Sequence, residues 1–153
     1  MKRFLCDNTI GKLMKKLRLL GFDAQPFDEY RNNNDRILLT RSREKWQKWP
    51  GESFLIVSNN WRDQLKEVER RYSLIQEMRP FTRCVECNTL LADVKAEEVR
   101  DRIPERVFLT VKDFKICPNC KRIYWHGTHV ENIMKNFEGV FDIDKFREFT
   151  KNF

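Results

Sequence analysis

The sequence predicts an α/β fold, a parallel sheet flanked by helices, followed by a small cysteine-rich module. Two observations predict the sheet: short, continuously apolar runs typical of buried parallel strands, and segments of helical periodicity that alternate with them. A third observation, two Cys-x-x-Cys pairs in the second half of the chain, predicts the module.

The N-terminal half opens with a strand and a helix. Residues 3–6 are apolar, end at Asp7 and are predicted as a buried strand. Residues 10–21 follow with helical periodicity, and Gly21 is a suitable C-terminal cap. The apolar face of this helix carries Ile10, Leu13, Met14, Leu17 and Leu20. A carboxylate is therefore expected where the first strand ends and the first helix begins.

The next segments continue the alternation. Strands are predicted over 22–24, 36–40 and 54–57, and helices over 44–49 and from 61 to about 75. The polar segment 28–35, which contains Asn32, Asn33 and Asn34, is predicted as a loop. Because ligands bind beyond the carboxyl ends of parallel strands, the polar residues Asp7, Asp23 and Ser42 are candidates for a site.

The two cysteine pairs are Cys84-x-x-Cys87 and Cys117-x-x-Cys120, with 29 residues between them. Four thiolates close the coordination sphere of a structural zinc ion. Two disulfides or a thiol redox pair are the alternatives, and the lack of a visible secretory signal favours zinc. The long gap is expected to hold a hairpin, with one strand over 107–111 and another over 123–125.

Composition limits the partners. The 153 residues include 30 basic and 23 acidic side chains, which gives a formal charge of +7. A basic protein favours polyanions such as RNA, DNA or an anionic membrane surface, although charge also serves solubility alone. No run of 18 apolar residues predicts a membrane span, and no signal peptide is visible, so a cytoplasmic location is expected.

The rest of the chain completes the predicted organisation. Helices are predicted over 130–137 and 143–149, after the second cysteine pair. The expected domains are an α/β domain over 1–80, a zinc ribbon over 81–137 and a helical tail over 138–153.

Several of these segments together resemble the Mut-seven C-terminal RNase domains. The residues that carry the resemblance in the first half are Phe4-Leu5-Cys6-Asp7, Gly11, Leu13, Leu17-Arg18, Leu20-Gly21-Phe22-Asp23 and Arg36-Ile37-Leu38-Leu39-Thr40-Arg41. In the second half they are Arg83-Cys84, Cys87-Asn88, Cys117-Pro118, Cys120, Ile123-Tyr124-Trp125, Gly127 and His129. The resemblance covers residues 3 to 137 and implies a PIN-like ribonuclease fold with a C-terminal zinc ribbon.

The resemblance also implies an activity and a site. PIN-like nucleases cut RNA with Mg²⁺ or Mn²⁺ held by clustered carboxylates, so it implies a metal-dependent ribonuclease. Asp7 matches the first acidic position of the family, and Asp28 is the nearest candidate for the second, followed by Glu29. Ser42 stands where the family usually has aspartate, and a hydroxyl holds a hard cation only weakly. The alternative is an RNA-binding module that has lost the chemistry and serves as an RNA or ribonucleoprotein adaptor.

The expected partner is RNA, and because PIN-like domains often pair, a homodimer is left open by the resemblance. The cations closest in sequence to the strand ends are expected to contact RNA: Lys12, Lys15, Lys16, Arg18, Arg41 and Arg43.

Overall fold

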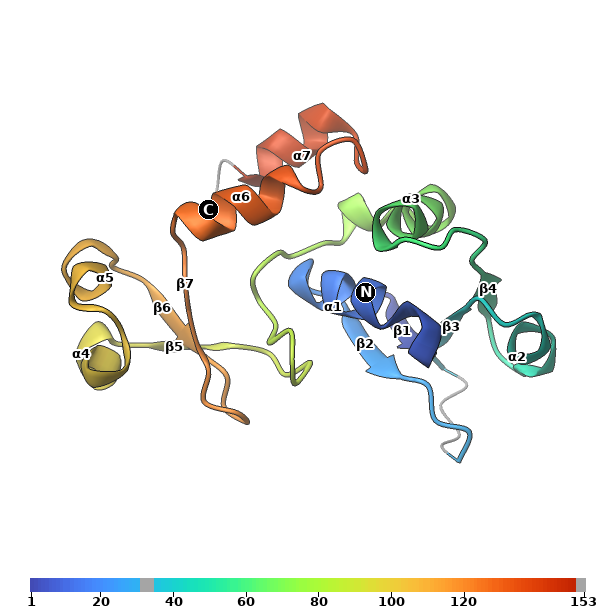
Figure 1. The fold of residues 1–153 in the computed structure, drawn as a ribbon, viewed down its shortest axis with the longest axis horizontal. Helices are drawn as coiled ribbons and strands as arrows, with labels where there is room; N and C mark the ends of the chain where they lie inside the picture. Colours follow the sequence, from blue (N-terminus) through green and yellow to red (C-terminus); the bar gives the residue numbers. More distant parts are fainter. Residues whose placement is uncertain (31–34, 151–153) are drawn as a thin grey trace. The chain divides into compact units, whose positions relative to one another are not determined.

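The computed structural model of the protein describes residues 1–30 and 35–150, and it places them in two compact units, Met1–Asn88 and Thr89–Phe153 (Figure 1). The predicted loop at Asn32 to Asn34 lies outside the described residues, as does the side chain of His129. The two units are described separately below, and the predicted three-domain partition stays a prediction.

The first unit is built on a four-stranded sheet in the order β2-β1-β3-β4. The strands are β1 (Arg3–Cys6), β2 (Asp23–Pro26), β3 (Ile37–Thr40) and β4 (Ser53–Leu55). Every neighbouring pair is parallel, and Cys6 at the end of β1 is in register with Pro26 of β2 and Leu39 of β3. The parallel sheet predicted from the continuous apolar runs is therefore confirmed, and the carboxyl ends of its strands share one edge.

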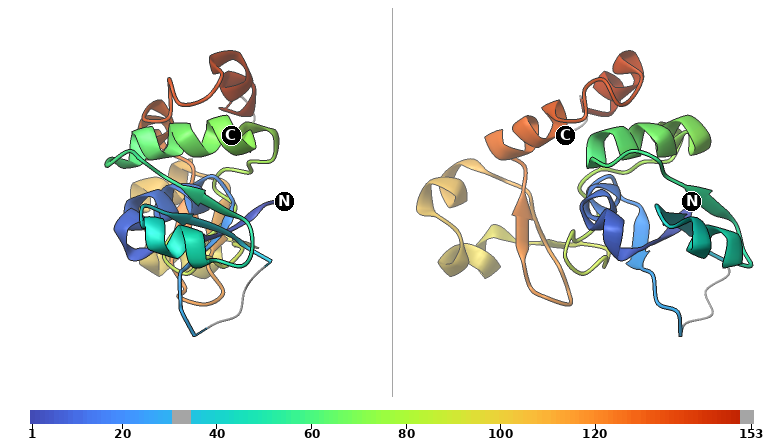
Figure 2. Two further views of the ribbon diagram at one scale, coloured as in Figure 1. Left: turned by 90° about the vertical axis from the view of Figure 1, so that its right-hand side faces the viewer. Right: turned by 45° about the vertical axis from the view of Figure 1, so that its right-hand side comes forward.

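Helices flank this sheet. They are α1 (Gly11–Leu19), α2 (Arg43–Lys48) and α3 (Trp61–Tyr72), with single 3₁₀ turns η1 (Asn8–Ile10) and η2 (Leu74–Gln76). Helix α1 packs against β2 and α3, and α2 packs against β3 and β4. These helices are labelled in Figure 1 and seen from two further sides in Figure 2. The apolar face predicted for α1 is in the core, where Leu13, Leu17 and Leu20 are fully buried with Phe4 and Phe22.

Asp23, a sequence candidate for a site beyond the carboxyl ends of the strands, lies at the opposite edge of the sheet. It is the first residue of β2, at the amino edge of the sheet, and its carboxylate accepts hydrogen bonds from both terminal nitrogens of Arg36, at 2.7 and 2.9 Å. The side-chain amide of Asn88 donates a further bond to it at 2.7 Å. This carboxylate holds the fold together and is removed from the candidate site.

Gly21 ends α1 in a conformation that other residues rarely adopt. Its φ is +93°, and a Cβ built on it would lie 2.2 Å from the backbone oxygen of Arg79. Two backbone bonds hold the segment around Arg79 against this helix end: Arg79 N–H donates to Leu20 at 2.8 Å, and Phe81 N–H donates to Leu19 at 3.0 Å. The prediction that Gly21 caps the helix is confirmed, and the close approach adds a second demand for glycine.

We therefore expect Gly21→Ala to lower the free energy of unfolding by roughly 3 kcal/mol, because it combines backbone strain with a clash against backbone atoms. Gly11→Ala is the matched control: it lies in α1 with no heavy atom within 4 Å of its built Cβ. That change should stabilise the protein by about 0.5–1 kcal/mol. Chemical denaturation of both variants checks this, and equal midpoints for the two would contradict it.

The second unit contains an antiparallel sheet in the order β5-β6-β7, formed by β5 (Ala92–Val94), β6 (Phe114–Ile116) and β7 (Ile123–Trp125). Between β5 and β6 lie α4 (Ala96–Val99), the 3₁₀ turn η3 (Arg100–Arg102) and α5 (Glu105–Thr110). Their apolar side chains form a small core around Val99, Ile103 and Phe114. The strand predicted over 123–125 is confirmed as β7.

The strand predicted over 107–111 is wrong, because this segment lies in α5 and the residue that follows it. Val107, Phe108 and Val111 pack on the small core, at a spacing that one helical turn provides. Pro104 precedes the helix and Glu105 lies in its first turn, both of which favour a helix start. A five-residue apolar run does not distinguish a strand from a buried helical turn, and these flanking residues were the better signal.

Two helices end the described chain, α6 (Thr128–Lys135) and α7 (Ile143–Thr150), close to the predicted bounds. Contacts between phenylalanine rings connect the segment after α6 to α7. The ring centroids of Phe137 and Phe141 lie 6.3 Å apart, and the stacked rings of Phe141 and Phe146 have centroids 5.7 Å apart. Among the described residues, every helix is too short or too polar to cross a lipid bilayer.

Candidate functional site

The first cysteine pair forms a tight turn. Asn88 N–H donates to the carbonyl of Cys84 at 2.8 Å, and Cys87 N–H points at the Cys84 sulfur at 3.4 Å. Asn88 closes the turn with φ of 65°, a left-handed conformation that asparagine tolerates better than most residues. The turn thus directs one backbone N–H, that of Cys87, toward the Cys84 sulfur, which stabilises a thiolate.

The second pair repeats this construction at each equivalent position. Lys121 N–H donates to the carbonyl of Cys117 at 2.9 Å, and Cys120 N–H lies 3.5 Å from the Cys117 sulfur. Lys121 has φ of 67°, matching Asn88. Arg102 donates a bond of 2.7 Å to the Lys121 carbonyl and so ties this turn to η3. Two unrelated sequences therefore adopt the same metal-binding turn.

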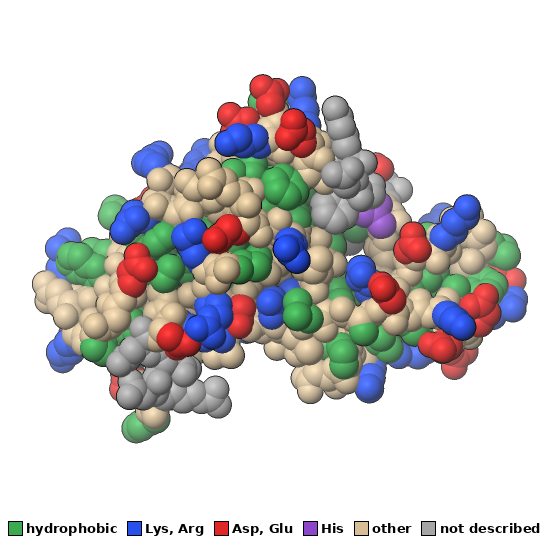
Figure 3. Space-filling model, turned by 180° about the vertical axis from the view of Figure 1, so that it is seen from behind, with side chains coloured by type: hydrophobic (Ala, Val, Ile, Leu, Met, Phe, Trp, Pro, Cys, Tyr) green, Lys and Arg blue, Asp and Glu red, His purple; other side chains and the backbone are tan. Residues whose placement is uncertain are grey.

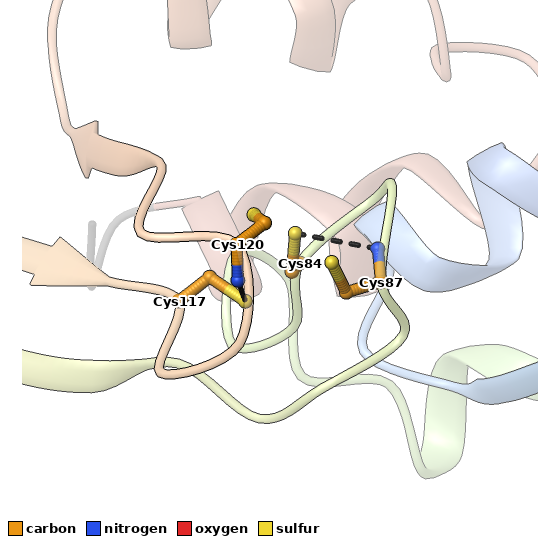
Figure 4. Close-up of side chains that lie close together, drawn as sticks. All are labelled: Cys84, Cys87, Cys117 and Cys120. Carbon is orange, nitrogen blue, oxygen red and sulfur yellow. Dashed lines mark hydrogen bonds between the residues drawn. The ribbon is translucent and has the colours of Figure 1, made fainter.

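The four sulfurs of Cys84, Cys87, Cys117 and Cys120 lie within 4.8 Å of one another (Figure 4). Zn–S bonds of about 2.3 Å in a tetrahedron place sulfurs about 3.8 Å apart, so a zinc ion fits with small shifts of the side chains. All five cysteines of the chain are free of disulfides. The cluster can bind a structural zinc ion, since four thiolates leave no coordination position for water or substrate.

Asp7 follows β1 at the carboxyl edge of the sheet and is 1% exposed. One of its carboxylate oxygens accepts bonds from the backbone N–H of Thr9, at 2.8 Å, and from the Thr9 hydroxyl. The other accepts a bond from the Thr40 hydroxyl at the end of β3, and the ammonium of Lys45 lies 4.0 Å from it. The sequence singled out Asp7 and placed it beside Thr40, but it did not indicate Thr9 or Lys45.

These contacts determine the charge of Asp7. Burial by itself raises the pKa of a carboxyl group, but the hydrogen bonds from Thr40 and Thr9, helped by the charge of Lys45, outweigh it. The pKa of Asp7 lies below its ordinary value of 3.8, so the group is ionised at neutral pH. The edge of the sheet thus carries a buried negative charge with a lysine as its counter-ion.

Ser42 has a local structural role. Its hydroxyl accepts a bond from Lys45 N–H at 3.3 Å and caps α2, and its own N–H donates to the Thr40 hydroxyl at 2.9 Å. Serine is among the preferred N-cap residues. Ser42 thus lies beside Thr40 at the carboxyl edge of the sheet, and its hydroxyl caps α2. A catalytic role for Ser42 stays a prediction.

Asp28 also lies beyond a carboxyl end, because the preceding residue, Phe27, donates its N–H to the Cys6 carbonyl at 2.8 Å. The Asp28 carboxylate accepts a bond from Tyr30 N–H at 3.0 Å. It borders a cleft of about 430 Å³ within the first unit. The cleft is lined by Arg18, Gln25, Pro26, Phe27, Asp28, Cys87 and Asn88.

A divalent cation does not fit the arrangement around Asp7 as it stands. Mg²⁺ and Mn²⁺ prefer about six oxygen ligands with carboxylates among them. Within residues 1–30 and 35–150, the only group of three or more His, Cys, Asp or Glu side chains close enough for one ion is the cysteine cluster. Both oxygens of Asp7 are already hydrogen-bonded, and a lysine stands beside one of them.

The predicted RNA-contacting cations lie in different settings. Arg18 is 6% exposed and donates bonds to the carbonyls of Ala24, Val85 and Glu86, at 2.8, 2.9 and 3.2 Å. Its guanidinium therefore supports the fold, and we remove it from the proposed RNA surface.

The other five cations are closer to solvent. Lys12, Arg41 and Arg43 are exposed, whereas Lys15 pairs with Glu86 at 3.3 Å and Lys16 lies over the Trp61 ring at 4.7 Å. Because α1 starts at the carboxyl edge and runs away from it, Lys12 lies nearest that edge on this helix. On the face shown in Figure 3, basic and acidic side chains are interspersed.

Comparison with known proteins supports one family. The model of the Mut7-C RNAse domain matches residues 2–137, most of the 153-residue chain. The comparisons with curated proteins and with solved structures gave no match. The matched range includes both the sheet edge that carries Asp7 and all four clustered cysteines. The chain therefore belongs to the Mut7-C RNAse domain family.

Proposed function

We propose that the protein is a ribonuclease that hydrolyses RNA phosphodiester bonds at the carboxyl edge of the β2-β1-β3-β4 sheet. The observation that carries the proposal is Asp7, an ionised and nearly buried carboxylate that Thr9 and Thr40 hold in place in a member of an RNase family. A buried charge is costly unless it is satisfied, so a fold that retains one at a strand end indicates a site.

The described residues supply two kinds of group for this reaction. Asp7 offers a fixed negative charge that can orient a water molecule, and Lys45, Arg41 and Arg43 offer positive charge for a phosphate. The resemblance to PIN-like nucleases extends the proposal to Mg²⁺ or Mn²⁺ as cofactor, and the cytoplasm is proposed as the location. The zinc ion has a structural role in this proposal.

The second candidate function is RNA binding without hydrolysis, as an adaptor. It is favoured by a specific observation: Asp7 has a lysine beside it where a nuclease of this type requires further carboxylates, and Ser42 uses its hydroxyl as a helix cap. In this alternative the carboxyl edge binds the RNA backbone, and Asp7 contributes to stability alone.

A cleavage assay separates the two candidates. End-labelled RNAs of varied sequence and structure are incubated with the zinc-loaded protein in Mn²⁺, in Mg²⁺ and without an added divalent ion. A strong chelator is avoided because it would also attack the cysteine site. Cleavage by wild type that is lost in Asp7→Asn supports the ribonuclease. RNA binding without cleavage in all three conditions supports the adaptor, and equal cleavage by both proteins would place the activity elsewhere.

RNA binding itself is expected to depend steeply on salt. If Lys12, Lys15, Lys16, Arg41 and Arg43 each neutralise a phosphate, affinity for single-stranded RNA should fall roughly a hundredfold between 50 and 200 mM salt. Arg43→Ala should weaken binding and reduce this slope. Lys48→Ala is the control, since Lys48 lies in the same helix but pairs with Glu44 at 2.7 Å. An affinity that does not change with salt would refute the proposed surface.

A further inference from the structure

Lys45 is held at the sheet edge by more than one interaction. Its ammonium lies 4.0 Å from a carboxylate oxygen of Asp7 and 5.3 Å from the centre of the Phe27 ring. Its backbone N–H donates to the Ser42 hydroxyl, which fixes the first turn of α2 and therefore the start of the side chain. A cation over an aromatic face and beside a carboxylate has two attractive partners at once.

A lysine one turn further along α2 shows that this placement is particular to Lys45. The side chain of Lys48 is 76% exposed and pairs with Glu44, which is 74% exposed, whereas that of Lys45 is 31% exposed beside a fully buried carboxylate. Exposed ion pairs such as Lys48–Glu44 contribute little to stability. A lysine beside a buried carboxylate, in contrast, acts as the counter-ion of that carboxylate. Lys45 thus neutralises Asp7.

We propose that Lys45 is the resident cation of this site, and that a divalent ion reaches Asp7 only by displacing the Lys45 ammonium. One carboxylate and one ammonium are already neutral together. Thr9, Thr40 and Ser42 add hydroxyl groups without charge, so nothing among them offsets a second cation. A divalent ion placed beside an undisplaced ammonium would be repelled at close range.

The inference rests on the proposed function because it concerns the same site around Asp7. It predicts how that site binds a metal ion and makes no claim about RNA. Binding of Mn²⁺ is measured by the electron paramagnetic resonance signal of the free ion, with zinc-loaded protein and no RNA. Wild type should bind Mn²⁺ weakly. Lys45→Met, which keeps the length and apolar stem of the side chain, should bind at least about tenfold more tightly.

Two further variants provide the controls. Lys48→Met removes a charge from the same helix and should leave Mn²⁺ affinity at the wild-type value. Asp7→Asn combined with Lys45→Met should abolish the gain, which identifies Asp7 as the ligand. Circular dichroism and zinc content show that each variant is folded.

The inference is overturned if Lys45→Met binds Mn²⁺ no more tightly than wild type. It is also overturned if wild type already binds tightly through Asp7, or if Lys48→Met gives the same gain. These outcomes differ from failure of the proposed function. Tight Mn²⁺ binding by Lys45→Met, together with no RNA cleavage by wild type, would uphold the role of Lys45 and refute the ribonuclease.

Discussion

Cys84→Ser is expected to eliminate stoichiometric zinc and to leave residues 83–137 without stable structure. Cys84 is fully buried and is one of four sulfurs within 4.8 Å of one another. Zinc binding by small domains is worth roughly 10–16 kcal/mol at neutral pH. That is as large as the whole stability of an ordinary domain, so the small core around Val99 and Phe114 cannot replace it.

Elemental analysis and hydrogen exchange measure this effect. The amides of β6 and β7 should be protected in wild type and exchange freely in Cys84→Ser. Cys6→Ala is the matched control, because Cys6 is also buried but lies in β1, and burial raises the pKa of its thiol to about 12. It should retain one zinc ion per chain and lose only packing. Full zinc content or full protection in Cys84→Ser would show that the cluster is not the zinc site.

Asp7→Asn is expected to abolish RNA cleavage and also to destabilise the protein. The Asp7 carboxylate accepts bonds from Thr9 and Thr40 with both oxygens, but an asparagine side chain has one acceptor oxygen, so one of the two acceptor positions is lost. The loss of a buried, charge-assisted bond costs about 1–3 kcal/mol. Cleavage must therefore be compared at a temperature where chemical denaturation shows both proteins folded.

The pH dependence of stability gives an independent check. The pKa of Asp7 is lowered on folding, so its stabilising contribution is fully present above the unfolded value of 3.8 and is lost as pH falls through the lower folded value. The difference in unfolding free energy between wild type and Asp7→Asn should be constant near neutral pH and shrink below about pH 4. Other carboxyl groups with lowered pKa, among them Asp23 and Glu67, affect both proteins equally and cancel in this difference.

Asp28→Asn is the control for the two stability measurements, and it tests Asp28 as the second candidate carboxylate in the cleavage assay. Asp28 also lies at the carboxyl edge, but it is half-buried, and its carboxylate accepts a bond from the backbone N–H of Tyr30, two residues along the chain. It should change stability little and leave the acid-induced difference unchanged. If Asp28→Asn removes cleavage while Asp7→Asn retains it, the central role belongs to Asp28.

The sequence by itself determined the parallel sheet, the amphipathic α1 and the cysteine cluster. Each depends on a pattern that local physical chemistry enforces. Strands buried on both faces require continuous apolar runs, a surface helix requires an apolar stripe, and a Cys-x-x-Cys turn places two sulfurs together within four residues. Asp7 belongs here too, since a carboxylate directly after a buried strand is visible without coordinates.

Only the tertiary structure decided what surrounds Asp7. Thr40 and Lys45 reach it from β3 and α2, and their place depends on strand order and on the register that pairs Cys6 with Leu39. The same holds for two other charged residues. Arg18 was expected to contact RNA, but its guanidinium donates bonds to backbone carbonyls. Asp23 was a candidate for the site, but its carboxylate is paired with Arg36. A charged residue shows its type in the sequence, but its partner is set by packing between distant segments, and the partner decides whether the charge serves stability or function.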